Sequence, residues 1–474
     1  MAKDLRTYLT DLSALCPEEL LLINKPVDCK LEATTVLRKL ELDGRQPLTV
    51  FENPSDLTGN QSTYPLLFNA FSTRKKLCIG LGMDLKDYKM PLSLELNRRY
   101  ANRIAPITIT HSEAPVKEEI FRGESCGFNR LPIPTHHQYD GGPYILGGSI
   151  ITRNPESGAY NLAMIRIHIK DDKTAAIHAE PHHHTGMNIK KWGEMGKKAP
   201  LAVVIGHHPG FYLGSQWEGP YGTEEYEMAG AALGEPLRLV PSETWGDHMM
   251  VPADAEMILE CEVDWNERLE EGPIGEHTRH YKNLMDGKIK VQLDPKLTLL
   301  CMTARKDAYF QSLFIGHSEH YLIGSIPKEA VIFDRVRFTC PGLKQVHMTP
   351  GGCGRYICYL SLKQRVGGEA RDAIMAAFVC DWHIKYVVAV DEDVDVYSDS
   401  EVLWAIATRT QPDKATFIIP GAMGATVDPT VDSVTKITSK MGIDATRPYG
   451  KPFSEVCEVP LDLLNSIRLE DYLK

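Results

Sequence analysis

The 474-residue sequence has no run of 18 consecutive apolar residues, so nothing in it predicts a helix that crosses a membrane. The N-terminal segment MAKDLRTYLTDL is charged and amphipathic and lacks the apolar centre of a signal peptide. An excess of positive charge is also missing, because 52 Lys and Arg stand against 63 Asp and Glu. An acidic surface attracts neither nucleic acid nor anionic lipid. We therefore expect a cytoplasmic protein that binds neither nucleic acid nor membranes.

Paired cysteines are absent as well. The eleven cysteines, from Cys16 to Cys457, form no C-x-x-C pair. Their number and scatter argue against a disulfide framework or a zinc site and predict reduced, mostly buried thiols. The glycine-rich segments contain neither the G-x-G-x-x-G fingerprint nor a P-loop, so a common nucleotide-binding motif is not indicated.

Three regions of the sequence differ in their pattern of apolar and polar residues. Residues 1–105 begin with a predicted helix at 4–15, and short apolar runs at 48–52, 66–71 and 77–83 then alternate with helical stretches, as in an α/β domain. The next region consists of short alternating or apolar segments broken by Gly and Pro, which predicts a β-rich barrel or sandwich. The last region again alternates strand-like and helical segments. A linker is expected near 323–330.

Two carboxylates flank a turn in the sequence EGPIGEHT, residues 271–278. Glu271 and Glu276 stand on either side of a Gly-Pro-x-Gly sequence, which favours a shaped loop over a helix. Such a turn can point both side chains into one pocket, where each carboxylate perturbs the protonation of the other. The motif indicates general acid and base chemistry, whereas an acidic surface turn is the simpler interpretation of the motif alone.

A single cation interrupts the apolar segment YNLAMIRIHI, residues 160–169. Burial of Arg166 is costly unless it meets a carboxylate or an anionic ligand, and an edge-strand arginine that faces water is an equally good interpretation. Asn161 lies five residues earlier. Residues five apart on a regular strand face opposite sides. Both can serve one site only if the strand twists, bulges or ends between them.

Further polar residues could bind a metal ion. His182, His183 and His184 are adjacent, and because successive side chains diverge, at most one or two of them can bind one ion. A polar surface cluster is the alternative. Glu225 precedes a segment that predicts a helix, where an acidic residue also suits the helix dipole. Asn161, one histidine and Glu225 would offer oxygen and nitrogen donors to Mn²⁺ or Mg²⁺.

In their order and spacing, these motifs resemble those of the UbiD family of decarboxylases, which use prenylated FMN. The resemblance extends to about residue 430 and includes KYVVAVDEDVD followed by EVLWAIATRT. It implies an N-terminal α/β domain over residues 1–105 and a central split β-barrel, of flavin-reductase type, over 106–322. A linker helix and a C-terminal α/β oligomerisation domain would follow over 323–474.

The resemblance also implies roles for single residues in binding the cofactor. Asn161, His184 and Glu225 would hold Mn²⁺ (or Mg²⁺) next to the cofactor phosphate, with K⁺ as a further candidate ion. His183 would line the prenylated FMN, and Lys385 would reach its phosphate. If the sequence is aligned with the family from a different anchor residue, His183 becomes the metal ligand in place of His184. Both assignments stay open.

Arg166, Glu271 and Glu276 would form the catalytic set, with Arg166 also among the cofactor contacts. In this scheme Arg166 neutralises the substrate carboxylate and pairs with Glu271. Glu276 supplies the proton that replaces carbon dioxide, in a site shielded from water. The resemblance further implies a flavin prenyltransferase as supplier of the cofactor, and a homodimer or homohexamer.

The expected reaction is reversible, non-oxidative decarboxylation of an aromatic or heteroaromatic acid, phenolic acids included. Glu319 and His320 favour this class because they resemble a Glu-His pair of members that act on dihydroxy- and trihydroxybenzoates. The alternative substrate is an aliphatic or phenyl-substituted α,β-unsaturated acid, and a flavin carrier without catalytic activity is a weaker rival. Arg279, beside His280 and Lys282, is either a substrate contact or a solvent-facing side chain.

Overall fold

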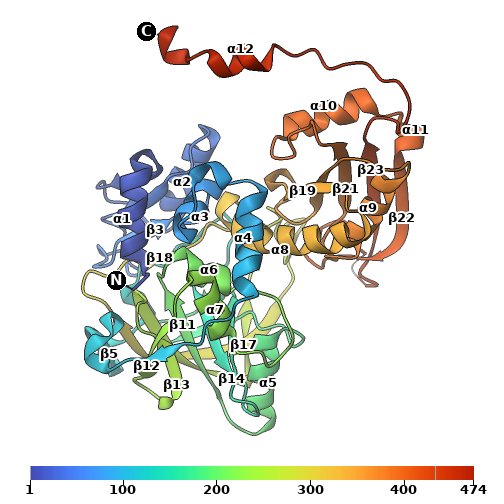
Figure 1. The fold of residues 1–474 in the computed structure, drawn as a ribbon. Helices are drawn as coiled ribbons and strands as arrows, with labels where there is room; N and C mark the ends of the chain where they lie inside the picture. Colours follow the sequence, from blue (N-terminus) through green and yellow to red (C-terminus); the bar gives the residue numbers. More distant parts are fainter. Residues whose placement is uncertain (1, 433, 474) are drawn as a thin grey trace.

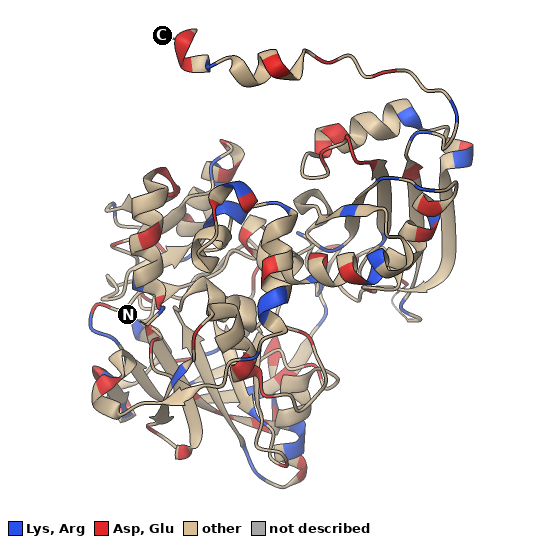
Figure 2. Cartoon of the chain, in the orientation of Figure 1, with Lys and Arg blue, Asp and Glu red and all other residues tan. Residues whose placement is uncertain are grey.

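The computed structural model describes residues 2–432 and 434–473, which form three regions in chain order. In Figure 1 the N-terminal helices, in blue, lie above the large central sheet, and the C-terminal sheet, in orange, stands beside them. The long helix α8 (Ser318–Thr339) runs between these parts and contains the whole of the expected linker at 323–330. Lys/Arg and Asp/Glu are interspersed over all three regions (Figure 2).

A small sheet and four helices make up the N-terminal region. The strand order is β1-β2-β3-β18, so a strand at residues 310–311 completes a sheet built mainly from the start of the chain. The predicted helix at 4–15 is confirmed, and it starts with a capping box in which the Asp4 carboxylate accepts from the Thr7 N–H. The elements are α1 (Leu5–Leu15), β1 (Leu20–Ile23), α2 (Glu32–Leu42), β2 (Leu48–Phe51), β3 (Leu66–Phe68), α3 (Arg74–Leu81), α4 (Met90–Tyr100) and β18 (Phe310–Gln311).

The apolar run at residues 77–83 is helical, so its prediction as a strand is wrong. Thr73 caps the N-terminus of α3, and Gly82 ends the helix in the left-handed region with φ 66°. A short apolar run without alternation fits a buried helix as well as a buried strand. The helix is buried closely, since a Cβ at Gly80 would come within 2.9 Å of the Pro209 Cβ.

The central region is a curled, half-barrel sheet with the order β6-β9-β10-β17-β14-β11-β7-β8, to which β5 adds by pairing with β17. The two longest strands, β14 and β17, pair with register shifts at Glu260/Cys261 and at Asp264/Arg268, and such shifts bend a sheet. The strands of this sheet are β5 (Glu119–Arg122), β6 (Tyr144–Ile145), β7 (Ser149–Arg153), β8 (Tyr160–Met164), β9 (Ile167–Ile169), β10 (Thr174–Ile177), β11 (Ala199–Ile205), β14 (Met257–Glu271) and β17 (Gln292–Ala304). The region also contains a three-stranded sheet of β4 (Ile107–Thr108), β12 (Arg238–Ser242) and β13 (Gly246–Pro252), and a two-stranded sheet of β15 (Leu284–Met285) and β16 (Lys288–Ile289).

Both faces of this sheet are covered by apolar side chains. Along β11, Ala202 and Val204 belong to the core shared with the helices, whereas Leu201, Val203 and Ile205 belong to the core inside the curl. This alternation is the period of two that a strand imposes. Three helices of the region, α5 (His184–Glu194), α6 (Pro209–Gly214) and α7 (Glu225–Leu233), accompany the sheet.

The C-terminal region is a five-stranded sheet in the order β19-β20-β21-β23-β22, in which β20, β21 and β23 are parallel. Residues 448–473 are exposed, and in Figure 1 this tail extends away from the rest of the chain. No helix in the described part of the chain is both long and apolar enough to cross a membrane. The elements are β19 (Leu343–Met348), β20 (Ile357–Leu362), α9 (Glu369–Phe378), β21 (Tyr386–Asp391), α10 (Asp399–Arg409), α11 (Pro412–Ala415), β22 (Thr416–Met423), β23 (Ile437–Ala445) and α12 (Leu461–Ser466).

Candidate active site

Arg166 lies at a break between two strands. The segment at 160–169 folds as β8 and β9, which pair with different partners, β7 for β8 and β6 and β10 for β9. Asn161 therefore belongs to one strand, and Arg166 lies just outside it. The strand ends between the two residues, so the alternation of one regular strand does not force their side chains to opposite faces.

The guanidinium of Arg166 binds both carboxylates of the EGPIGE turn. Its Nε lies 2.9 Å from Glu271 Oε1, and its Nη1 lies 2.7 Å from Glu276 Oε1. Glu271 ends the long strand β14 and is 2 % exposed, and Glu276 is 6 % exposed. The turn thus points both side chains into one buried site. The interpretation as an acidic surface turn is excluded.

The electrostatics of the site favour the charged forms of Arg166 and Glu271. Burial acts to raise the pKa of Glu271, but the adjacent Arg166 outweighs it and holds the pKa below its usual range. Burial acts to lower the pKa of Arg166, but the charges of Glu276 and Glu271 outweigh it and raise the pKa above its ordinary value. The site holds an arginine that is ion-paired with two buried carboxylates.

Four further residues support Glu271, and sequence reasoning missed all of them. The Tyr144 hydroxyl donates to Glu271 Oε1 at 3.2 Å, and the Tyr144 ring stacks on His168 at 4.3 Å between centroids. His178 Nδ1 lies 2.9 Å from Asp294 Oδ2, and both are close to Glu271. These residues come from β6, β9, β17 and the segment after β10, so no local spacing could have indicated them.

A second polar cluster contains the predicted metal ligands. Glu225, at the first turn of α7, is 3 % exposed and accepts hydrogen bonds through Oε2 from Asn161 Nδ2 at 2.8 Å and from the Leu162 N–H at 2.6 Å. His184 Nδ1 lies 3.5 Å from Glu225 Oε1. Thr185 donates to Asn161 Oδ1 at 2.7 Å. The residues around this small cavity are Asn154, Ala159, Tyr160, Asn161, His184, Asn188, Tyr221, Gly222, Thr223 and Glu225.

This donor set fits a divalent cation. Among the described residues, only His184 is a potential cationic partner of the buried Glu225 carboxylate. A buried carboxylate that has no permanently charged cation beside it is stabilised by a bound metal ion. The oxygen and nitrogen donors of this cluster suit Mn²⁺ or Mg²⁺. His183, by contrast, precedes α5 as its N-cap, and its ring lies against His182 at 4.4 Å.

Other predicted residues lie elsewhere. In the C-terminal region, Lys385 binds Asp428 at 2.8 Å and also Thr430. Arg279 and His280 are exposed, so Arg279 faces solvent in this structure, while Lys282 lies 3.6 Å from Glu180.

Glu319 and His320 do not form a pair. Glu319 turns toward the N-terminal region, where it accepts from the backbone N–H groups of Asn69 and Phe71 at 3.0 and 3.2 Å. His320 points to a different group of residues that includes His277. Adjacent residues on a helix diverge by about 100°. The two side chains therefore lie in different surroundings.

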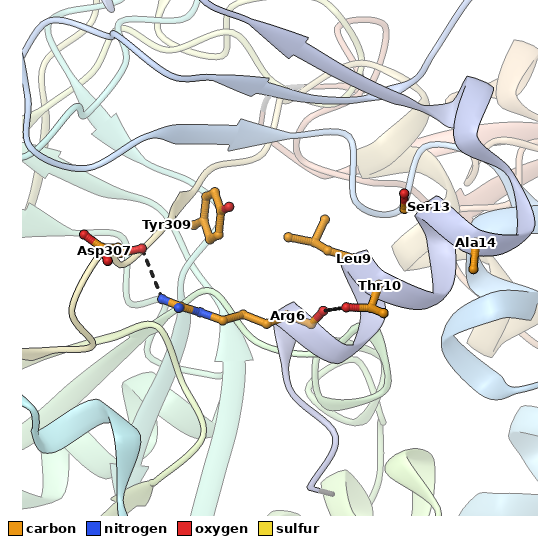
Figure 3. Close-up of a pocket in the computed structure, with 7 residues that line it drawn as sticks. All are labelled: Arg6, Leu9, Thr10, Ser13, Ala14, Asp307 and Tyr309. Carbon is orange, nitrogen blue, oxygen red and sulfur yellow. Dashed lines mark hydrogen bonds between the residues drawn. The ribbon is translucent and has the colours of Figure 1, made fainter.

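An open depression of about 540 Å³ lies between α1 and the segment before β18 (Figure 3). Arg6 crosses it and donates to the backbone carbonyls of Lys306 and Asp307 at 3.0 and 3.1 Å. None of the predicted site residues lines it, although it is larger than the cavity beside Glu225. The guanidinium of Arg6 also binds the Glu256 carboxylate.

Similarity to known proteins covers all three regions of the chain. Three family models described as domains of 3-octaprenyl-4-hydroxybenzoate carboxy-lyase match residues 17–89 (N-terminal domain), 108–318 (Rift-related domain) and 321–445 (C-terminal domain). The chain is 31% identical over 431 residues to anhydromevalonate phosphate decarboxylase of Methanothermobacter thermautotrophicus, covering 91% of this chain and 95% of the relative.

Solved structures show the same fold. The UbiD-class enzyme HmfF from Pelotomaculum thermopropionicum, in complex with FMN, superposes with a TM-score of 0.89 at 32% identity and covers 99% of this chain and 100% of its own. Vanillic acid decarboxylase of Sedimentibacter hydroxybenzoicus, in open form, gives 0.85 at 26% identity, with 99% and 98% covered. The three family models, together with relatives similar over nearly the whole chain, establish that this protein belongs to the UbiD family of decarboxylases, the carboxy-lyases.

Proposed function

We propose that the protein catalyses reversible, non-oxidative decarboxylation of a conjugated carboxylic acid with prenylated FMN as cofactor. The observation that carries this proposal is the buried contact of Arg166 with Glu271 and Glu276. A cation between two carboxylates can exchange one of them for the carboxylate of a substrate and leave the other to move a proton. The complex of HmfF with FMN supports a flavin cofactor.

Each residue of the triad has a separate task. Arg166 binds and orients the substrate carboxylate. Glu271, held by Tyr144 and Arg166, keeps the guanidinium in place. Glu276 delivers a proton to the carbon that has lost carbon dioxide. When bound, prenylated FMN supplies the electron sink for that carbon. Burial of both carboxylates excludes water, which would compete for the proton.

Asn161, His184 and Glu225 would hold Mn²⁺ (or Mg²⁺), with K⁺ as a further candidate ion. The support is the 3.5 Å approach of His184 to Glu225, whereas within the described part of the chain His183 makes no such contact. His183 would line the cofactor, and Lys385, after exchange of its contacts with Asp428 and Thr430, would bind its phosphate.

Two substrate classes are proposed. An aromatic or heteroaromatic acid is supported by the similarity to vanillic acid decarboxylase. An α,β-unsaturated acid, with a phosphorylated acid as one form, is supported by the curated relatives named anhydromevalonate phosphate decarboxylase. Because Glu319 faces away from His320, the structure lends no support to hydroxybenzoates in particular.

The protein is further proposed to act in the cytoplasm as a homodimer or homohexamer, with a flavin prenyltransferase as supplier of the cofactor. Support for self-association comes from the tail. Its residues 451–473 expose large apolar side chains, including Leu461 at 71% and Tyr472 at 71%, and extend away from the body of the chain in Figure 1. Apolar surface of this kind favours association.

The test is anaerobic purification after co-expression with a flavin prenyltransferase, followed by absorbance spectroscopy, mass analysis of the released flavin and metal analysis. The expected result is prenylated FMN with about one divalent ion per chain, and turnover of at least one acid from a panel of aromatic and α,β-unsaturated acids. A protein that releases only unmodified FMN, from cells with a demonstrably active prenyltransferase, would contradict the proposal and favour a flavin carrier.

A further inference from the structure

Arg355 is a half-buried cation without an anionic partner. It follows β19 in the loop before β20, and within residues 2–432 and 434–473 its side chain forms neither an ion pair nor a hydrogen bond. The guanidinium lies on Gly324 of α8, where a Cβ would come within 2.4 Å of Nη2. Because Gly324 has no side chain, α8 leaves space for the guanidinium, and any larger residue at this position would occupy that space.

Polar rings from three chain segments surround this position. His277 directly follows Glu276, and its ring lies parallel to the Tyr356 ring at 5.8 Å between centroids. His320, one helical turn before Gly324, meets the His277 ring edge-on at 5.9 Å. The group therefore joins the loop of the catalytic acid to α8 and to the loop that carries Arg355.

Two buried polar atoms of this group lack partners. In the described part of the chain, neither His277 Nε2 nor the Tyr356 hydroxyl makes a hydrogen bond, and His277 is only 8 % exposed. Buried polar atoms without partners are unfavourable, and they are normally satisfied by water or a ligand. An anion beside Arg355 would accept from both groups.

Among the described residues at this place, Arg355 is the cation that has no ion-pair partner. Lys328 and His383 both pair with Asp381. Burial, assisted by the charge of Arg355, lowers the pKa of His320 to about 3 and that of His277 well below its usual range, so both rings are neutral donors near neutral pH. A single uncompensated guanidinium among neutral donors is suited to one anionic group.

We propose that Arg355, with His277, His320 and Tyr356, binds a second anionic group of the substrate, either a phosphate ester or a second carboxylate. This inference rests on the proposed function, in which Arg166 holds the carboxylate that is lost. Arg166 is already balanced by Glu271 and Glu276 and has no charge left for a second anion. Arg355 would therefore select dianionic over monoanionic acids.

The test compares three conjugated acids of one carbon skeleton, unsubstituted, with a second carboxylate, and with a phosphate ester, on the holoenzyme. Arg355→Gln is expected to raise KM at least 30-fold for the preferred dianionic acid and to change kcat little, while KM of the monoanionic acid changes less than twofold. The dianionic acid that shows the larger effect identifies the group as phosphate or carboxylate. Arg335→Gln is the matched control, since Arg335 is an exposed residue of α8.

Two further measurements keep the proposal open to refutation. Gly324→Ala retains every charge but displaces the guanidinium, and it should raise KM selectively for the same dianionic acid. Titration calorimetry with inorganic phosphate or malonate should show binding to the wild-type holoenzyme that is at least tenfold weaker in Arg355→Gln. If Arg355→Gln does not fold, the Gly324→Ala comparison decides.

The outcomes separate the two proposals. Equal KM changes for monoanionic and dianionic acids in both variants, or inorganic anions that bind the wild type and Arg355→Gln alike, would overturn the role of Arg355 while leaving decarboxylation intact. A prenylated-FMN-loaded wild type that turns over no acid would refute the proposed function instead, and the calorimetry would then still decide whether Arg355 binds anions.

Discussion

Arg166 donates a hydrogen bond to Glu276 across 2.7 Å, although the two residues are separated by 110 positions in the chain. The same guanidinium binds Glu271, so one cation joins two buried carboxylates that a glycine-rich turn presents together. Under the proposed function, this contact would define both the place of the substrate and the source of the proton.

Replacement of Glu276 by Gln should remove the proton donor while preserving the shape of the site. Decarboxylation should fall by about 10²–10⁴-fold, the usual contribution of a positioned acid, and the flavin content should stay unchanged. Turnover and the flavin absorbance of the same preparation check this. Glu270→Gln, at the exposed neighbour of Glu271 on β14, is the control and should retain activity. Full activity of Glu276→Gln would show that another group supplies the proton.

Arg166→Gln should destabilise the fold, because it leaves Glu271 and Glu276 buried without their cation. Loss of one partner of a buried ion pair costs about 3–5 kcal/mol. Arg166 holds the pKa of Glu271 below its ordinary value, so the contribution of Glu271 to stability is present above that ordinary value and is lost as the pH falls through the lowered pKa. The difference in unfolding free energy between wild type and variant should therefore be larger at pH 7 than at pH 4. Denaturant titrations at both pH values measure it, and a difference independent of pH would argue against the ion pair.

Substitution of the two neighbouring histidines should separate their roles. His184→Ala should lose bound Mn²⁺, because His184 lies 3.5 Å from the Glu225 carboxylate, whereas His183→Ala should keep it. Metal analysis of proteins purified in parallel from manganese-supplemented cells is the measurement, with Glu225→Gln as a second variant that should lose the ion. The reverse pattern, metal retained without His184 and lost without His183, would exchange the two assignments.

A buried ion pair couples the N-terminal region to α8. Arg74, 7 % exposed, binds the fully buried Glu329, which also contacts His347 at 3.0 Å. Arg74 and His347 overcome the effect of burial and hold the pKa of Glu329 at about 2, so its stabilising effect is present above about pH 4.5 and is lost as the pH falls toward 2.

Glu329→Gln should consequently lower the free energy of unfolding at pH 7 by about 3–5 kcal/mol. Guanidinium titration followed by circular dichroism would report the change. Glu392→Gln, which removes an exposed partner of Lys363, is the matched control and should cost less than about 1 kcal/mol. Equal midpoints for the Glu329 variant and the wild type would mean that the ion pair contributes nothing.

The exposed tail should contribute to self-association. Light scattering should give the mass of a homodimer or homohexamer for the full chain, and removal of residues 451–474 should shift the mass toward that of the monomer, because the apolar side chains of the tail are lost with it. A full chain that is monomeric at micromolar concentration would contradict the proposed assembly. An oligomer unaffected by the deletion would place the interface elsewhere.

The functional motifs themselves were visible in the sequence. The Gly-Pro-x-Gly turn between Glu271 and Glu276 is a local feature, since glycine and proline restrict the backbone at their own positions. The helix that starts at Glu225 and the strands around it follow from hydrophobic periodicity. The isolated Arg166 indicates a carboxylate or anionic ligand nearby, because a guanidinium in an apolar segment needs such a partner. Each of these conclusions depends only on neighbours in the chain.

What the sequence by itself determined, then, is the set of local elements and the residue types placed on them, together with the family they resemble. Only the tertiary structure decided which distant residues meet: that β8 ends before Arg166, that Tyr144 and His178 support Glu271, that Glu319 turns away from His320, and that Arg355 rests on Gly324 with no counter-ion among the described residues. The reason is physical. Backbone preferences act over a few residues, whereas the partner of a buried charge is selected by the packing of elements that lie far apart in the chain.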